Sequence, residues 1–443
     1  MARAARRRRS PGTRALWREY RALFPRYFWS DETRLASILV ASAKDSTLVD
    51  VDGKPYIDLT SQWATNNLGH VHPDVLRATT EALERYGFLI YFMNPHPPML
   101  ELARKLLGVR PSPNLTRVFL ELSGTGAAEG AVKYAVEATE RPVVLSFLGQ
   151  YHGLSIAAGM IGALSSHERR FWEPYGGGVV HAPYPAPSHR PDGMSAEEYG
   201  GWVLDYIRDG LLRHVVDPSR VAGAIFEPVA CEAGVWIPPK SFVTGLRRLC
   251  DEHGWVYIDD EVEAGVGRTG KMWAVEHFGV APDLVAIGKG LSGGLMPIAA
   301  VLGTEELMAE HDVAAGTTFG GHPAACVAAA TTLDVMRREK VVERSARLGR
   351  RALRRIAEWE RFDGVVETRG LGLCLAVELG RDRRTPDPAT ARAVFFESVR
   401  RGTIPLYNYG DHVLRIQPPL TIREEELDRA LDTLESVLRR RAG

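Results

Sequence analysis

An acidic cluster lies in an apolar stretch near the middle of this 443-residue chain. Asp259, Asp260 and Glu261 fall within Trp255–Val262, whose apolar residues predict a β-strand. In open α/β sheets, ligands bind at the carboxyl ends of the strands, so carboxylates at such an end can do chemistry. Taken alone, the cluster indicates a helix cap or a surface turn. A metal site is the next alternative, but no histidine or ordered acidic spacing accompanies the cluster.

A lysine follows another predicted strand, Leu284–Ile287, and stands between two glycines as Gly288-Lys289-Gly290. Flanking glycines let the backbone approach a ligand closely, although a single lysine in such a loop is usually only solvated. Paired with Asp260 at a neighbouring strand end, Lys289 indicates a site for pyridoxal phosphate (PLP). That cofactor needs a lysine for a Schiff base and an anion that keeps its ring nitrogen protonated.

The phosphate of such a cofactor needs a cup, and Ser123-Gly124-Thr125-Gly126 can provide one. The segment lies between a predicted strand and a predicted helix, where backbone N–H groups bind phosphate without a cation. Its spacing, G-x-G-x-x-x-G, does not fit a dinucleotide-binding fingerprint. A second polar, glycine-rich segment, Thr317–Pro323, also precedes a predicted helix.

The elements around these residues indicate an α/β fold. Runs rich in Val, Ile and Leu alternate with amphipathic segments, which predicts a mostly parallel sheet covered by helices on both faces. The predicted strands are Arg117–Leu122, Val143–Phe147, Val221–Val229, Trp255–Val262, Leu284–Ile287 and Ile298–Leu302, and the predicted helices are Ala128–Thr139 and Ser241–Glu252.

The C-terminal part has a different pattern, which predicts a smaller α+β domain. Its predicted elements are a helical stretch over Pro323–Trp359, a strand over Val365–Leu379, a helix over Ala389–Arg401, a strand over Val413–Ile416 and a helix over Arg423–Arg440. Four regions follow: a disordered basic tail (1–20), an N-terminal segment that packs with the small domain (21–71), a large PLP-binding domain (72–330) and a C-terminal small domain (331–443).

Five of the first nine residues are arginines, and no apolar segment follows them, so they do not form a secretory signal. A transit peptide and a nucleic-acid-binding arm are alternatives to a solvated tail. The formal net charge is zero, with 55 basic and 55 acidic residues, which gives no general indication of nucleic-acid or membrane partners. Four widely spaced cysteines indicate a reduced, cytoplasmic protein, and we expect no metal site.

Several blocks of the sequence, in order, resemble the class III aminotransferases, a family of PLP enzymes with fold type I. The blocks are Ser123–Thr125, Tyr151–Gly153, Glu227–Pro228, Asp260–Gly270, Pro282–Leu284, Gly288–Gly290 and Thr318–Gly321. The resemblance implies a large PLP domain with a mostly parallel sheet, a small α+β domain built from both chain ends, and a homodimer.

The family's cofactor contacts carry over onto residues of this chain. By resemblance they are Lys289 (Schiff base), Asp260 (ring nitrogen), Val262 (under the ring), Tyr151 (over the ring), Gly124 and Thr125 (phosphate cup), and Thr318, which reaches the partner subunit's phosphate across the dimer.

Substrate contacts are implied in the same way. Arg415 matches an arginine that grips a substrate carboxylate, since a planar guanidinium binds carboxylate at two points. Glu232 matches an acid that can pair with that arginine. The alternative for Arg415 is a structural salt bridge at a strand end. Trp63 lies in a segment that lines the substrate pocket in relatives, although a tryptophan there could equally pack in the core.

Two positions depart from the family pattern. Relatives that bind a distal carboxylate often have an arginine where this chain has Leu154, and without a cation a second buried carboxylate is unfavourable. This favours neutral substrates. Many relatives have glutamine where this chain has Glu263, which would face the phenolic oxygen of PLP. Two negative groups repel there unless one is protonated or a cation intervenes, so Glu263 either holds a proton or points elsewhere.

The function predicted from these residues is transamination between a neutral amino acid or amine and a keto acid, with PLP held as a Schiff base on Lys289. The alternative is an amino-acid racemase or epimerase, which needs the same site but consumes no keto acid. A non-enzymatic PLP-binding or nucleic-acid-binding protein is a third reading, which the Lys289–Asp260 pair disfavours because both halves of the cofactor site are present.

Overall fold

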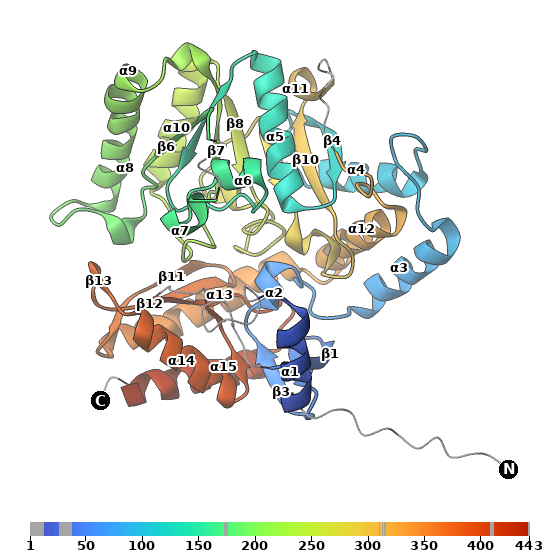
Figure 1. Cartoon of the computed structure of the whole chain (residues 1–443), viewed down its shortest axis with the longest axis vertical. Coiled ribbons are helices and arrows are strands. Elements are labelled where there is room, and N and C mark those ends of the chain that lie inside the picture. Colours follow the sequence, from blue (N-terminus) through green and yellow to red (C-terminus); the bar gives the residue numbers. More distant parts are fainter. Residues whose placement is uncertain are drawn as a thin grey trace.

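The computed structural model of the chain describes residues 13–25, 38–171, 176–309, 311, 313, 316–407 and 412–441. Figure 1 shows two bodies, one above the other. The upper body contains a seven-stranded sheet, and the lower body contains the C-terminal elements together with the N-terminal strands.

The seven-stranded sheet has the strand order β4-β10-β9-β8-β7-β5-β6. Its strands are β4 (Leu115–Glu121), β5 (Val143–Phe147), β6 (Val179–Ala182), β7 (Val221–Phe226), β8 (Val256–Asp260), β9 (Leu284–Ile287) and β10 (Ala299–Thr304). Strand β10 is antiparallel to both neighbours, and the pairs from β9 to β6 are parallel. All residues of β5, β7, β8 and β9 are buried, as in sheets covered on both faces. The predicted α/β fold with a mostly parallel sheet is confirmed.

Helices connect and cover these strands, and α5 crosses in front of the sheet in Figure 1. The longer helices of this body are α3 (Pro73–Tyr86), α4 (Pro97–Gly108), α5 (Gly124–Thr139), α8 (Ala196–Asp205), α10 (Lys240–His253) and α12 (Pro323–Arg338). The shorter ones are α6 (Ile156–Ile161), α7 (Ser166–Arg169), a π-helical turn (Tyr206–Leu211), α9 (Leu212–His214) and α11 (Glu305–Ala309). Short 3₁₀ turns cover Pro187–His189, Pro218–Arg220, Ala274–His277, Lys289–Ser292 and Glu358–Arg361.

Two smaller sheets form the lower body. In the first, β3 pairs in parallel with β14, so segments from the two ends of the chain share the sheet β1-β2-β3-β14. The second has the order β11-β12-β16-β15, with β13 paired to β12. The strands are β1 (Val40–Lys44), β2 (Thr47–Asp50), β3 (Pro55–Asp58), β11 (Val365–Leu371), β12 (Cys374–Asp382), β13 (Thr385–Pro386), β14 (Thr403–Ile404), β15 (Leu406–Tyr407) and β16 (Val413–Ile416).

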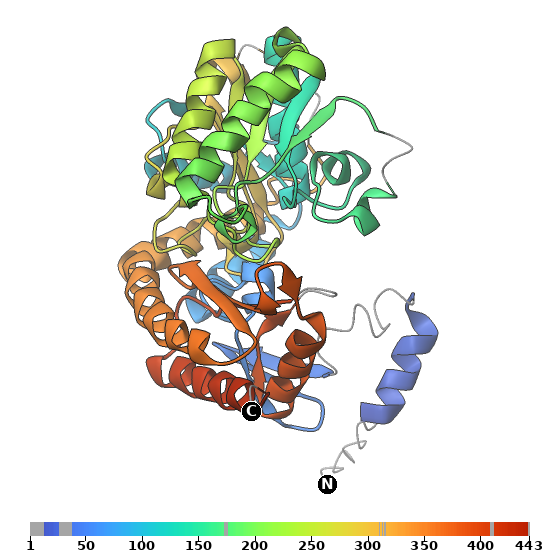
Figure 2. The same ribbon diagram turned by 90° about the vertical axis from the view of Figure 1, so that its left-hand side faces the viewer.

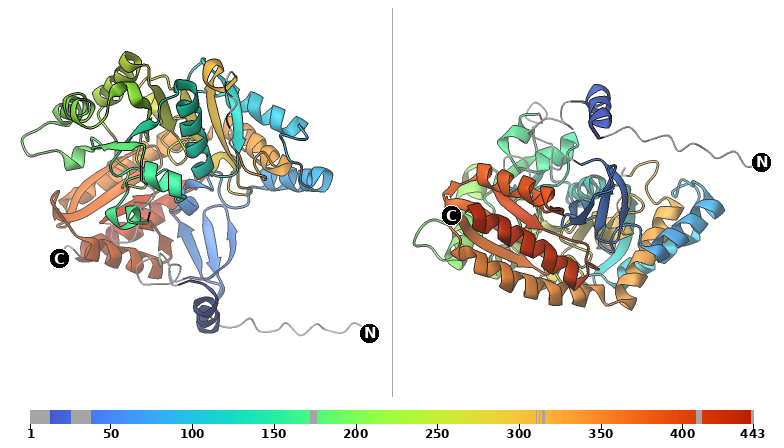
Figure 3. Two further views of the ribbon diagram at one scale, coloured as in Figure 1. Left: turned by 45° about the horizontal axis from the view of Figure 1, so that its top comes forward. Right: turned by 90° about the horizontal axis from the view of Figure 1, so that it is seen from below.

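Three long helices pack on this lower body: α13 (Val341–Ala357), α14 (Pro388–Arg400) and α15 (Glu424–Arg441). Seen from below in Figure 3, α14 and α15 lie side by side. The exact domain boundaries given above stay a prediction. None of the helices in the described residues has the length and apolar character needed to cross a membrane.

Two predicted elements are each divided in the structure. The strand predicted over Val365–Leu379 is the hairpin β11–β12, because Gly372 adopts a left-handed φ of 54° and reverses the chain. The helical stretch predicted over Pro323–Trp359 is α12 followed by α13. Lys340, with φ 51°, separates the two helices.

The disordered tail predicted for residues 1–20 is wrong from Thr13 onward. Thr13–Leu23 form helix α1, whose aromatic side chains meet at helical spacing: Trp17 packs edge-on against Tyr20, which stacks on Phe24. Figure 2 shows α1 standing apart from the two bodies. Residues 1–12 of the predicted tail, and 26–37 of the N-terminal segment, lie outside the described residues.

Candidate active site

The predicted site residues follow strands that end at one edge of the large sheet. Strands β5, β7, β8 and β9 are parallel, and β4 runs the same way because β10 is antiparallel to both β9 and β4. Their carboxyl ends therefore meet at one edge, where ligands bind in such sheets. Asp260 ends β8, Lys289 follows β9, Tyr151 follows β5, and Gly124 follows β4.

Asp260 is nearly fully buried and is held by two donors. One carboxylate oxygen, Oδ2, lies 2.7 Å from His152 Nδ1, and the other, Oδ1, accepts a hydrogen bond from the Val262 amide at 3.0 Å. The side chain of His152 is completely buried, and its Nε2 has no hydrogen-bond partner among the described residues. An imidazole N–H facing Asp260 fixes the orientation of the carboxylate. The sequence analysis quoted the Tyr-His-Gly turn but gave this histidine no role.

Lys289 and Glu263 form an ion pair at the same edge of the sheet. The lysine Nζ donates to Glu263 Oε2, while Oε1 of the same carboxylate accepts from Arg415 and Gln417, each at 3.2 Å. Burial disfavours the charged carboxylate, but the Lys289 and Arg415 cations outweigh burial and lower the pKa of Glu263. In the cofactor-free chain the Glu263 side chain therefore points into the site with a cation on each oxygen, whereas its protonation state beside bound PLP stays a prediction. Cations on both oxygens are the third condition under which a carboxylate can face a phenolate.

Nearby carboxylates stabilise the positive charge of Lys289. Burial disfavours its ammonium form, but the carboxylates of Glu263 and Glu232 outweigh burial and raise the pKa of Lys289. The residue also has a left-handed φ of 40°, a conformation that non-glycine residues rarely adopt outside functional sites. The loop that follows β9 thus has a strained backbone at Lys289, and the lysine amine points toward Glu263.

Arg415 is fully buried and bridges two carboxylates. It lies 2.8 Å from Glu232 and 3.2 Å from Glu263, and it also donates to the carbonyl oxygen of Cys231 at 2.9 Å. The side chain of Glu232 is 15% exposed, against 5% for Glu263. Glu232 is therefore the partner that can leave most easily when another carboxylate arrives.

Glu227 is a buried carboxyl group that sequence reasoning placed in a family block without assigning it a role. Its Oε1 accepts a hydrogen bond from the Tyr151 amide at 2.7 Å. Burial, reinforced by the neighbouring charge of Asp260, raises the pKa of Glu227 well above its usual value. Its contact with the Tyr151 amide therefore holds the Tyr151 turn in place.

Three loops meet closely around the N-terminus of α5. A Cβ added to Gly124 would lie 2.4 Å from Val262 Cγ1, and one added to Gly153 would lie 2.4 Å from Thr125 Oγ1. Only glycine permits these contacts, so the first turn of a 16-residue helix faces the same cleft as Asp260. A helix N-terminus for phosphate, a buried aspartate for a ring nitrogen and a partly buried lysine together fit PLP.

Trp63 lies on a turn of unusual handedness. Ser61, Gln62, Trp63 and Ala64 all have positive φ, between 39° and 60°. Thr60 caps the turn by accepting from the Gln62 amide at 2.9 Å. Trp63 is only partly buried, so the alternative of a core tryptophan is not what the structure shows.

This turn is anchored beside the lysine loop. Arg268 donates to Ser61 Oγ at 2.9 Å and to Asn67 Oδ1 at 2.7 Å. A Cβ on Gly290 would come within 2.2 Å of Asn67 Nδ2 and 3.1 Å of the Ala64 carbonyl oxygen. The turn that carries Trp63 therefore packs directly on the residue after Lys289.

Two predicted positions lie at the surface of the chain. Thr318 is exposed on a loop beside the end of β4, where its neighbour Thr317 lies 3.3 Å from Glu121 Oε2. Leu154 is 47% exposed. Thr318 is exposed in the single chain, and its role across a dimer stays a prediction.

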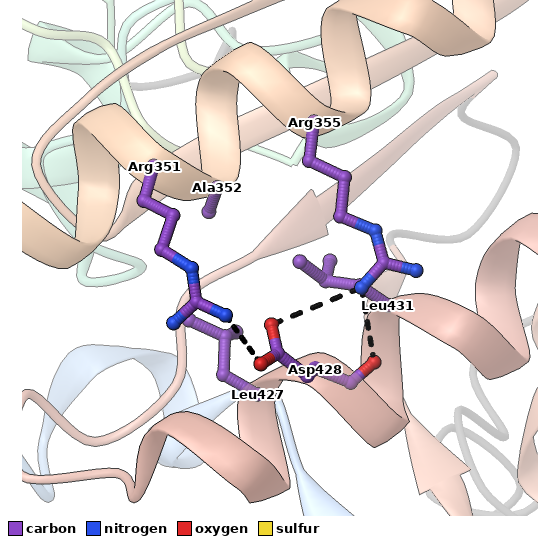
Figure 4. Close-up of a pocket in the computed structure, with 6 residues that line it drawn as sticks. All are labelled: Arg351, Ala352, Arg355, Leu427, Asp428 and Leu431. Atoms are coloured by element: carbon purple, nitrogen blue, oxygen red, sulfur yellow. Dashed lines mark hydrogen bonds and ion pairs between the residues drawn. The ribbon is translucent and has the colours of Figure 1, made fainter.

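A separate pocket opens between α13 and α15, lined by Arg351, Ala352, Arg355, Leu427, Asp428 and Leu431. Figure 4 shows both guanidinium groups directed at Asp428. Other carboxylates of α15 bind the same two arginines. The pocket contains none of the predicted site residues, and its positive charges are neutralised by ion pairs between the two helices.

Comparisons with known proteins agree with this geometry. The family model described as aminotransferase class-III matches residues 28–438. A leucine/methionine racemase of Thermococcus litoralis is 34% identical, over 95% of this chain and 94% of its own length. A 5-aminovalerate aminotransferase of Pseudomonas putida is 35% identical, over 90% and 92%. The solved structure of a PLP-bound amine transaminase from an uncultivated Pseudomonas species superposes with a TM-score of 0.85, at 27% identity, over 92% of this chain and 95% of that one.

Proposed function

The chain belongs to the class III aminotransferase family and is a PLP-dependent aminotransferase of fold type I, and we propose that it exchanges an amino group between a neutral amino acid or amine and a keto acid. The observation that carries the proposal is the meeting of Lys289, Asp260 and the α5 N-terminus at one sheet edge. PLP, when bound, supplies an electron sink for the charge that develops at the substrate Cα.

We assign the proton transfer to Lys289. Its amine lies beside Glu263 at the sheet edge that also carries Asp260, and it is the group that would take a proton from the substrate Cα and return it two atoms away, as a 1,3 proton shift requires. Asp260, oriented by His152, keeps the ring nitrogen protonated. Reduction of the holoenzyme with borohydride, followed by peptide mass spectrometry, should place the cofactor on Lys289. An adduct on any other lysine would overturn the assignment.

We assign the grip on a substrate carboxylate to Arg415. The arginine is already bonded to Glu232, so a substrate carboxylate must replace that partner, and an amine substrate leaves the pair intact. Leu154 supplies no cation for a second carboxylate, and the partly buried Trp63 supplies an apolar wall. We therefore expect kcat/KM to be higher for alanine, leucine and phenylalanine than for glutamate or 4-aminobutyrate. The reverse order would reject the neutral-substrate proposal.

Racemisation is the second candidate, favoured by the 34% identity to a leucine/methionine racemase. It uses the same lysine and aspartate but returns the proton to the opposite face of Cα. Incubating the holoenzyme with L-leucine and following chirality, with and without a keto acid, separates the two. Formation of D-leucine without keto acid would favour the racemase.

We also propose a cytoplasmic homodimer. The segment before α4 packs on the Thr318 loop, with Phe88 and Phe319 rings 4.7 Å apart. Phe92, Met93 and Phe319 on this surface are 66%, 68% and 53% exposed, and clustered apolar groups of this kind mark interfaces. Light scattering should give a dimer, and a fully active monomer would contradict the proposal.

All four cysteines are free thiols, which suits the proposed location in the cytoplasm, a reducing compartment.

A further inference from the structure

Two cysteine thiols meet behind the substrate side of the site. Sγ of Cys231 lies 3.4 Å from Sγ of Cys374, and both residues are fully buried. Cys231 lies in the loop after β7, next to Glu232, and Cys374 is the first residue of β12. The two thiols are 143 positions apart in sequence and join the body of the large sheet to the C-terminal sheet.

Each cysteine touches a residue that holds Glu263. Arg415 donates to the carbonyl oxygen of Cys231 at 2.9 Å, and Gln417 donates to Cys374 Sγ at 3.2 Å. The same two side chains donate to Glu263 Oε1. A change in the distance between the two sulfur atoms would therefore shift the donors of Glu263. Cys231 contacts Arg415, and Cys374 contacts Gln417.

We propose that Cys231 and Cys374 form a reversible disulfide when the protein meets a peroxide. Cys374 attacks one peroxide oxygen, the O–O bond breaks, and the first product is a sulfenic acid and water. The Cys231 thiol then displaces the hydroxyl group as a second water, and the S–S bond forms. Two thiols thus lose two electrons and two protons, and the peroxide is reduced to two molecules of water.

The arrangement also sets which thiol reacts first. The hydrogen bond between the two thiols, then burial, raises the pKa of Cys231, whereas that same bond lowers the pKa of Cys374, with help from Gln417 and Arg268. The Gln417 side chain, which donates to Cys374 Sγ, would stabilise a thiolate there, so Cys374 is assigned as the nucleophile and Cys231 as the resolving thiol.

The bond would move groups that the substrate depends on. A disulfide holds its sulfur atoms about 2.05 Å apart, so the two sulfurs must approach by roughly 1.3 Å. That movement shifts the Cys231 loop or β12, and with them the carbonyl oxygen that accepts from Arg415 and the sulfur atom that accepts from Gln417. We expect kcat/KM for an amino acid to fall by about tenfold, as for the loss of one charge-assisted hydrogen bond. This kinetic consequence rests on the proposed role of Arg415, whereas the disulfide itself does not.

The test treats wild-type holoenzyme with hydrogen peroxide and maps its peptides without reduction. A peptide pair linked through Cys231 and Cys374, lost again on treatment with dithiothreitol, is the expected result. Absence of that pair under conditions that oxidise the protein overturns the proposal, whatever the enzyme's activity. A linked pair with unchanged kinetics overturns only the effect on Arg415.

Matched variants complete the design. Cys231→Ser and Cys374→Ser should each abolish the link and the dithiothreitol-reversible fall in kcat/KM. The control variants Cys250→Ser and Cys326→Ser change the other two buried thiols and should keep both responses. An equal, reversible loss of activity in Cys374→Ser would show that another residue is oxidised. If a variant does not fold, the wild-type peptide map still decides.

Discussion

Carboxyl groups on the two faces of strand β8 have opposite environments. Asp260 receives hydrogen bonds from His152 and from the Val262 amide. Asp259 and Glu261 point to the other face, because side chains alternate along a strand. Neither oxygen of Asp259 accepts a hydrogen bond from an N–H or hydroxyl group of the described residues, and Asp259 lies against Glu261 instead.

All three groups are buried, so burial does not distinguish them. It raises the pKa of Asp259 well above its usual value and the pKa of Glu261 to about 8, in both cases with help from neighbouring carboxyl groups. On the site face, donors and cations surround Asp260 and Glu263. Glu261 also accepts a hydrogen bond from the Val275 amide at 2.8 Å, so donors alone do not separate the two faces. The histidine beside Asp260 and the cations beside Glu263, rather than depth, distinguish the site-face carboxylates from the core-face pair Asp259–Glu261, whose pKa values are raised.

The largest effect should come from Asp260→Asn. The amide cannot hold a proton on the ring nitrogen, so turnover should fall by about a hundredfold or more, while the bound cofactor measured by absorbance changes little. Asp259→Asn, one residue earlier and on the other face, is the matched control and should keep most of the activity. Equal losses of turnover in the two variants would show that the two faces of β8 do not differ in their contribution to catalysis.

Arg415→Ala should have the next largest effect. Removing the guanidinium should lower kcat/KM for amino acids by about one to two powers of ten, the range of a charge-assisted pair. An amine without a carboxylate, measured in parallel, should lose much less. A similar loss for both substrates would mean that Arg415 holds the cleft together rather than the substrate.

Glu263→Gln tests the ion pair between Glu263 and Lys289. Removing this carboxylate takes away the strongest support for the charged form of Lys289, so the pKa of the lysine should fall. In the cofactor-free protein, the rate of PLP capture depends on the neutral amine. When the pKa of the lysine falls by one unit, about tenfold more of the amine is neutral at a fixed pH below that pKa. The pH profile of the capture rate should therefore move to lower pH in the variant. An unmoved profile would contradict the ion pair.

The core-face pair should appear in the pH dependence of stability. Between pH 4.5 and about 8 the unfolded chain releases the Glu261 proton that the folded chain keeps. The free energy of unfolding should therefore fall as pH rises through this window, by about 1–3 kcal/mol, and level off above it. Glu261→Gln should flatten the fall in Tm scans, whereas Asp217→Asn, at an exposed position, should not. A stability that rises across this window would show that the pair is ionised.

Some of this site was predictable from sequence because the chemistry is local. Lys289 between glycines and Asp260 at the end of an apolar run are visible in a few residues each, and strand order brings their ends together. His152 and Glu227 were not predictable in their roles, since the Asp260–His152 contact joins residues 108 positions apart. The state of Glu263 depends on Arg415, 152 positions away, and so required the folded chain.

The left-handed turn at Ser61–Ala64 was beyond sequence reasoning for a different reason. None of its residues is a glycine, and nothing in their types marks a positive φ. The conformation is imposed by distant partners: Ser61 Oγ donates to the Gln417 carbonyl oxygen at 2.7 Å and accepts from Arg268. Local propensity is overridden there by tertiary contacts.

The Ser61–Ala64 turn should also be the part of the site that unfolds locally most easily. A left-handed residue other than glycine is disfavoured by roughly 1–2 kcal/mol, so four in a row are retained only while Arg268 and Gln417 stay in place. Brief opening of the segment is then easier than opening of the sheet, and its amides should exchange with deuterium well before those of β8. If Trp63 has its proposed role as a substrate wall, local unfolding of this turn would admit substrates of several sizes without any movement of the residues that hold the cofactor.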